Sequence, residues 1–186
     1  MNASSASSAP TAITYRIDPS HTLLELSAKH MMFTTVKGRF TGVTGTIVEA
    51  PHDRAGASSV DVEIDASSLS TGDDKRDAHL RSPDFLDVEK YPRISFKSTR
   101  FEGSGDKYKV IGDLTVHGTT REVTLDTTVN GTAKNPFGKE IIGFSAETEI
   151  NRKDFGLNWN VALEAGGVLV SDKVKVVIEI QAVRED

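Results

Sequence analysis

Histidines beside carboxylates are the first groups in this sequence that could do chemistry. His79 lies within five residues of Asp74 and Asp77, and histidine with carboxylates is a ligand set that zinc accepts. The spacing matches no established metal motif, so we expect no metal site and interpret this segment as the solvated face of a short helix. Because the chain contains no cysteine, it has no disulfide, thiolate zinc site, iron–sulfur cluster or thiol nucleophile.

Enzyme motifs are absent from the sequence. There is no Gly-x-Ser-x-Gly turn, phosphate-binding loop, dinucleotide fingerprint or His-Glu-x-x-His pair. Acidic residues are plentiful, but in the predicted strands they fall on the solvent-facing positions and suggest no acid and base pair. We therefore expect no catalytic residues and no cofactor. A hydrolase or isomerase that uses His30 is the least favoured alternative.

Length and charge limit the possible partners. The chain has 186 residues, with 22 basic and 27 acidic side chains and a net charge of −5, which is typical of one globular domain. An acidic chain without a basic block binds phosphate backbones weakly, so we expect no nucleic-acid partner. It contains no apolar run of the roughly 18 residues that a membrane helix needs, so we expect a protein that does not span a membrane.

The first residues predict a tail followed by a single domain. Residues 1–12 are mostly small or polar, so they bury too little surface to offset the entropy of ordering, and we expect a disordered tail. Residues 13–186 form the predicted domain. The tail lacks the basic start and apolar stretch of a secretory signal, so we expect a cytoplasmic protein.

A period of two dominates the rest of the chain and predicts strands with one apolar face. The strand-like segments are residues 15–18, 24–30, 39–49, 60–65, 94–102, 107–117, 121–130, 142–150 and 173–182. Turns are expected at residues 36–38, 103–106, 117–119 and 130–138, and a bulge at Gly42 and Gly45. Short links imply antiparallel neighbours, and closure removes exposed edges. We predict an all-β, eight-stranded antiparallel barrel, with charged side chains outside and an apolar interior.

The segment between residues 65 and 94 interrupts this period and is long for a connection in a compact domain. Its acidic start and Arg81 near its end predict a short helix over residues 73–81. Ser82 and Pro83 predict the start of a second helical turn. Phe85 and Leu86 would then cover a mouth of the barrel.

Motifs along the whole chain occur in an order that resembles one known family. They include Asp18-Pro19-Ser20-His21, Arg76-Asp77-Ala78-His79-Leu80, Asp84-Phe85-Leu86-Asp87, Tyr91-Pro92-Arg93-Ile94-Ser95-Phe96, Gly112-Asp113-Leu114-Thr115-Val116-His117-Gly118 and Asn151-Arg152-Lys153-Asp154-Phe155-Gly156. Over residues 13 to 183 the chain resembles the YceI-like, polyisoprenoid-binding family. The resemblance implies a lipocalin-like barrel whose lumen holds a long isoprenoid or similar lipid, often as a dimer. We accordingly expect a homodimer with a lipid ligand, such as a polyprenyl phosphate or a quinone tail, held for storage, shielding or transport.

Candidate ligand-binding residues are inward or loop side chains with a large apolar or polar group. They are Leu24, Leu26, His30, Phe33, Phe40, Phe85, Leu86, Phe96, Leu114, Phe144, Trp159 and Ile178. Arg81 and Arg152 are candidates for holding a phosphate head group, although structural pairing, for example of Arg152 with Asp154, is the alternative. Core packing is the simpler role for the apolar residues. Small inward residues (Ala28, Gly112, Ala146 and Ala182) favour a hollow lumen, and the alternative function is a structural or inhibitory module that binds a protein on its exterior.

Overall fold

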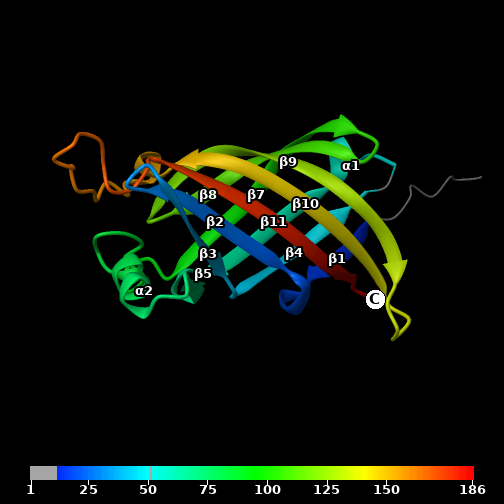
Figure 1. Ribbon diagram of the computed structural model, residues 1–186. Helices are drawn as coiled ribbons and strands as arrows, with labels where there is room; N and C mark the ends of the chain where they lie inside the picture. The colour runs from blue at the N-terminus through cyan, green and yellow to red at the C-terminus, as the bar shows by residue number, and fades with distance from the viewer. Residues whose placement is uncertain (1–11, 51) are drawn as a thin grey trace, which may run out of the picture.

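The computed structural model describes residues 12–50 and 52–186, and its strands form one antiparallel sheet that closes on itself (Figure 1). The predicted tail of residues 1–12 falls, apart from Ala12, outside the described residues. The strands are β1 (Ile13–Ile17), β2 (Leu23–His30), β3 (Thr34–Phe40), β4 (Val43–Glu49), β5 (Ser59–Asp65), β6 (Leu69–Ser70), β7 (Arg93–Ser104), β8 (Lys107–Val116), β9 (Thr119–Lys134), β10 (Glu140–Asn151) and β11 (Lys173–Arg184). Pairing of β1 with β11 completes the ring.

Six of these segments combine two by two into three barrel strands, each interrupted in the middle: β1 with β2, β3 with β4, and β5 with β6. Strands β1 and β2 both pair with β11, since Ile17 lies opposite Ala182 and Leu23 opposite Glu179. In the same way, β4 pairs with β1 and β3 pairs with β2. On the next strand, β5 pairs with β4 and β6 pairs with β3. The segments therefore make eight strands, each antiparallel to its neighbours in sequence. This confirms the predicted eight-stranded antiparallel barrel.

Two of the breaks use the same local chemistry. The 3-10 turns η1 (Pro19–His21) and η2 (Ala66–Ser68) follow Asp18 and Asp65. Asp18 accepts hydrogen bonds from the amide and hydroxyl of Ser20 at 3.0 and 2.6 Å, and Asp65 from those of Ser67 at 2.9 and 2.7 Å. These hydrogen bonds hold the pKa of both carboxyls below the usual value. The side chains thus satisfy backbone donors where the ladder is interrupted.

The bulge predicted at Gly42 and Gly45 and the turn predicted at residues 36–38 are both wrong. The third break lies at residues 41–42, where the Gly42 amide donates to Ser68 Oγ at 3.0 Å, so the strand is interrupted at Gly42 and not bulged. The register runs evenly past Gly45, so the bulge predicted there is wrong. The turn predicted at residues 36–38 is also wrong, because these residues lie within β3. Gly38 serves a close approach instead, since a Cβ there would lie 2.9 Å from Thr71 Cγ2.

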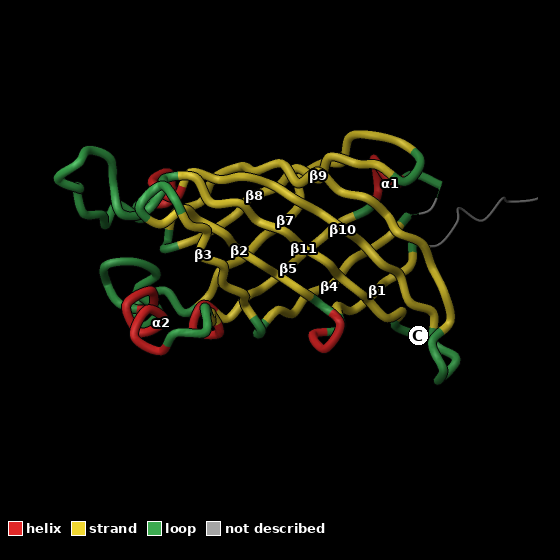
Figure 2. The backbone as a smooth tube through the Cα atoms, viewed as in Figure 1, coloured by secondary structure: helices red, strands yellow, loops and turns green. Residues whose placement is uncertain are grey.

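The connections gather at the two ends of the barrel, as the loops in Figure 2 show. The α2 end carries the turn at residues 31–33, residues 71–92 with α2 (Asp74–Arg81), the 117–118 turn, η3 (Arg152–Phe155) and the loop of residues 157–172. The α1 end carries α1 (Arg54–Ala57) and the turns at residues 105–106 and 135–139. In the part of the chain described here, no helix has the length and apolar character needed to cross a membrane.

The insert confirms the predicted helix, and a single hydrogen-bonded turn follows it at the predicted position. Asp73 caps α2, accepting a hydrogen bond from the Arg76 amide at 2.9 Å. Ser82 caps the end of α2, because its amide donates to the His79 carbonyl at 3.1 Å. Ser82 also begins the next turn, because its Oγ accepts a hydrogen bond from the Asp84 amide at 3.3 Å, as predicted for an N-cap before Pro83. A hydrogen-bonded turn follows, in which the Phe85 amide donates to the Ser82 carbonyl at 3.0 Å.

Candidate functional site

The lumen contains an apolar cavity of about 260 Å³. Nine of the predicted site residues line it: Leu24, Leu26, Phe40, Leu86, Phe96, Leu114, Phe144, Ile178 and Arg152. Its volume is just below the roughly 300 to 1,000 Å³ typical of ligand pockets. A cavity of this size and lining can take a narrow apolar chain.

The wall of the cavity is packed unevenly around the barrel. On β4, β5 and β7, inward side chains such as Val43, Ile64 and Ile94 are buried. On β9, β10 and β11, inward side chains such as Leu125 and Phe144 line the cavity but keep part of their surface accessible. Apolar groups that point inward and still have accessible surface must face an empty space. Partly accessible inward side chains are therefore concentrated along β9, β10 and β11, although residues of other strands, such as Val60, Phe101 and Leu114, also line the cavity.

Only one of the small inward residues contributes to the cavity. Of the four predicted to leave room, Ala146 on β10 lines the cavity, between Thr127 and Ile178 on the neighbouring strands. Gly112 leaves no space, because a Cβ there would lie only 2.7 Å from Cζ of Phe96. A register shift between Ser98 and Arg100 brings β7 close to β8 at this point.

A half-buried ion pair closes the cavity at the α1 end. Arg54 donates through Nε to Glu49 Oε1 at 2.7 Å, also through Nη2, and through Nη1 to the Gly105 carbonyl at 3.1 Å. Burial lowers the pKa of Arg54, but the Glu49 carboxylate outweighs it and raises the pKa above its usual value. Sequence reasoning missed this pair. The signal was Glu49 itself, a carboxylate on the apolar parity of β4, with an arginine five residues later.

Arg152 closes the cavity at the α2 end from beneath the loop of residues 157–172. It is 4 % exposed and donates to the carbonyls of Leu157 and Trp159 at 2.6 and 2.9 Å and of Ser171 at 2.9 Å. Its ion-pair partner is Asp172 at 3.9 Å, so the pairing predicted with Asp154 is wrong. Burial lowers the pKa of the guanidinium, and Asp172 opposes this effect.

The second predicted head-group residue is also engaged with the backbone. Arg81 donates through Nε to the Ser67 carbonyl at 2.9 Å and through Nη2 to the Leu69 carbonyl at 2.7 Å. It does not line the cavity. Both arginines thus hold their own chain in place, and a head-group role for either stays a prediction.

Phe85 and Trp159 do not line the cavity and instead contact each other at the α2 end, with ring centroids 5.2 Å apart. The His79 ring packs edge-on against both, with centroid distances of 5.0 Å to Phe85 and 4.6 Å to Trp159. His79 Nε2 lies 2.9 Å from Asp84 Oδ2. This cluster joins the insert to the loop of residues 157–172. Among the described residues no three histidine, aspartate or glutamate side chains are grouped so that they could hold a metal ion.

His30 and Phe33 also lie outside the cavity wall. His30 is bridged to Val170 of the long loop, because β2 continues past the end of the lumen. Phe33 sits in the turn after β2 and is 83 % exposed. The period of two grouped His30 with the inward residues of β2 but could not indicate where the lumen ends.

Comparisons with known proteins agree with this architecture. The model of the YceI-like domain matches residues 15–182. A UPF0312 protein of Staphylococcus aureus strain bovine RF122 / ET3-1 is 38% identical over 166 residues, covering 87% of this chain and 92% of that protein. The YceI protein of Campylobacter jejuni has a TM-score of 0.72 at 32% identity, covering 85% of this chain and 90% of its own. A polyisoprenoid binding domain from Saccharophagus degradans has a TM-score of 0.67 at 16% identity, covering 92% and 98%.

Proposed function

Because this chain belongs to the YceI-like family, we propose that its lumen holds the hydrocarbon chain of an isoprenoid or a similar long amphiphile. The observation that carries the proposal is the cavity in the lumen, which apolar side chains line but do not fill. The Saccharophagus degradans domain, which shares the fold, is described as polyisoprenoid-binding. In this proposal the protein is non-catalytic and stores, shields or transports its ligand.

Hydrophobic transfer is sufficient for such binding. Burial contributes about 0.8 kcal/mol per CH₂-sized group, so one five-carbon isoprene unit gives roughly 4 kcal/mol before the cost of association. Two or three buried units would then hold the ligand without a polar anchor. Chain length would govern affinity, and lipids of similar width would compete.

The head group is the finer part of the proposal. A polyprenyl phosphate or a quinone tail both supply the required chain. The Glu49–Arg54 pair at the α1 end is already neutralised within itself, and Arg152 is engaged with carbonyls at the other. A charged phosphate would have to displace these contacts, whereas an uncharged head would not. Assembly as a homodimer and location in the cytoplasm complete the proposal.

A lumen variant and a matched exterior variant test the proposal. Ala146→Trp places an indole in the hollow, while Glu147→Trp, the next residue of β10, places it on the exposed outer face. Glu147 contributes only a surface ion pair with Lys175 at 3.6 Å, which is worth little. Calorimetric titration with farnesol, a fifteen-carbon isoprenoid alcohol, should show one site in the wild-type protein and in Glu147→Trp.

The expected result for Ala146→Trp is loss of farnesol binding with the barrel still folded by circular dichroism. Binding that persists in folded Ala146→Trp would place the ligand elsewhere. Absence of binding in all three proteins, together with a protein partner that Ala146→Trp still captures, would favour the interaction module on the barrel exterior.

A further inference from the structure

Exposed apolar side chains cluster at the α2 end of the barrel. Six large hydrophobic residues of the described chain are exposed, and five of them lie here: Met31 (42 %), Met32 (57 %), Phe33 (83 %), Val161 (45 %) and Val168 (37 %). Residues 31–33 and 161–168 are called the apolar tip below. Single exposed hydrophobic residues are ordinary, but a cluster of them marks an interaction surface.

The two segments of the apolar tip form one unit. The Met31 amide donates to the Leu169 carbonyl at 2.8 Å. Met32 lies on Gly167, where an added Cβ would be 2.7 Å from Met32 Sδ. Figure 1 shows the orange loop that carries residues 161–168 extending beyond the end of the barrel. The loop of the apolar tip therefore projects from the end of the barrel.

The backbone that presents this surface is strained. Met31 and Met32 have φ values of +50° and +65°, a region that side chains other than glycine rarely adopt. Neither strain nor apolar exposure favours folding, yet both occur in the same turn. Such a combination indicates a functional surface.

Charge distinguishes among the possible occupants of the tip. Residues 30–36 and 157–171 contain a single Asp, Glu, Lys or Arg, namely Glu164, in a chain that is 26% charged. Lys29 lies at the base, where its amide donates to Ser171 Oγ at 2.9 Å. A projection whose only charged side chain is Glu164, with a lysine behind it, complements a lipid interface, where hydrocarbon lies beneath phosphates.

We propose that the apolar tip inserts into the interfacial layer of a lipid bilayer and holds the α2 end of the barrel against the membrane. Attachment itself is independent of the lumen. Only the use of this attachment, to exchange lipid between bilayer and lumen, rests on the proposed function. Because the chain carries a net charge of −5, attachment depends on apolar insertion and not on attraction to anionic lipids.

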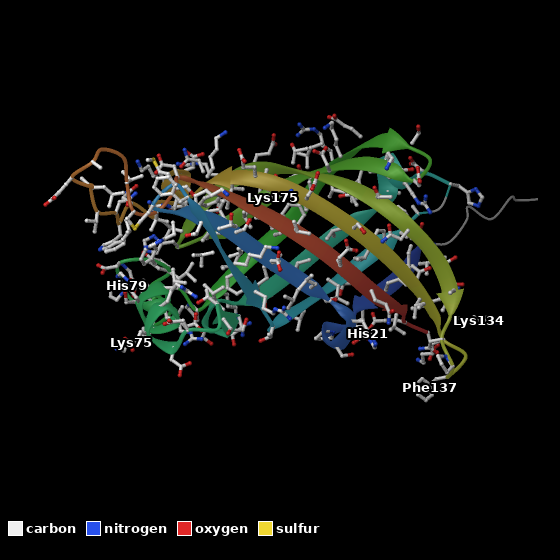
Figure 3. All side chains as sticks on the ribbon, in the orientation of Figure 1. His21, Lys75, His79, Lys134, Phe137 and Lys175 are labelled. Atoms are coloured by element: carbon white, nitrogen blue, oxygen red, sulfur yellow. The ribbon has the colours of Figure 1, made fainter. Side chains whose placement is uncertain are left out.

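Vesicle flotation with phosphatidylcholine vesicles tests the proposal on the full chain. Burial of one large apolar side chain changes a partition coefficient by roughly tenfold, so Phe33→Ser and Val161→Ser should each weaken attachment by up to that factor. Phe137→Ser is the matched control, because Phe137 is 90 % exposed and lies at the opposite end (Figure 3). It should attach like the wild-type protein, and raising the salt concentration should change little.

Two further measurements separate this proposal from the proposed function. Phe33→Ser should still bind farnesol, and Ala146→Trp should still attach to vesicles. Failure of the wild-type protein to float, or equal losses in Phe33→Ser and Phe137→Ser, would overturn the proposal whatever the farnesol result. A wild-type dimer that Phe33→Ser converts to a monomer would show instead that the tip contacts a second copy.

Discussion

Replacing Arg152 by methionine should loosen the cover of the lumen and lower the stability of the protein by about 2 to 4 kcal/mol. Three hydrogen bonds of 2.6 to 2.9 Å are lost, to the carbonyls of Leu157, Trp159 and Ser171. Hydrogen bonds to charged groups contribute roughly 1.5 to 3 kcal/mol each. Removing a buried guanidinium also removes its desolvation cost of several kcal/mol. The net loss of stability is therefore smaller than the sum of the three hydrogen bonds. Methionine keeps the apolar length of the side chain without its donors.

Urea denaturation with amide hydrogen exchange measures this effect. The exchange of residues 157–171 should accelerate more than that of β9 or β10, because the orphaned carbonyls all belong to the loop and its end. Arg152→Lys keeps the charge but not the planar set of donors, so its loss should be smaller. Arg16→Met is the control, since its side chain is 65% exposed and pairs with Glu185 at the surface; it should cost at most about 0.5 kcal/mol.

An Arg152→Met protein with wild-type stability and unchanged exchange at residues 157–171 would refute this reasoning. It would mean that the carbonyls find water or other donors at no cost. Uniform acceleration over the whole barrel would also contradict it, because the effect would then not be local to the loop.

Two other predictions concern acid and close packing. Hydrogen bonds from Ser20 and Ser67 hold the pKa of Asp18 and Asp65 below 3.8. The pKa of Asp77 is also lowered, because the effect of burial, which raises it, is outweighed by the hydrogen bonds from Thr71. The folded state thus binds fewer protons than the unfolded state, so stability should be full above about pH 4 and fall as these carboxyls protonate. Thermal unfolding at pH 7 and pH 3 measures this loss. The loss should be smaller in Asp77→Asn than in the wild-type protein. Gly112→Ala should lower the free energy of unfolding by about 3 kcal/mol, because β7 and Phe96 must move. Gly138→Ala is the control: an added Cβ there meets open space, but φ is +81°, so the loss should be only about 1 kcal/mol. Urea denaturation measures both.

The alternation of side chains was sufficient to predict the barrel, because a closed antiparallel sheet requires one apolar face in every strand. It correctly placed residues such as Phe144 and Ile178 toward the interior. It could not show which inward residues face empty space. That difference depends on the distance across the barrel, and at Gly112 a bulge in β7 closes the gap that the missing side chain would leave.

Contacts between segments that are distant in the sequence could not be predicted from the sequence. Arg152 lies close in sequence to Asp154, but the fold brings it to Asp172 and to carbonyls of the following loop. The partners of a long side chain are set by which loops converge at one end of the barrel, and local spacing carries no information about this. The pair of Glu49 and Arg54 differs, because both residues are near in sequence and Glu49 breaks the apolar parity of β4.

Native mass spectrometry of the intact chain after incubation with farnesol tests most directly whether the lumen holds an apolar chain. The account predicts one bound farnesol per subunit in the wild-type protein and in Glu147→Trp, and none in Ala146→Trp. An unliganded mass for all three proteins, or the same adduct on Ala146→Trp as on the wild-type protein, would contradict it.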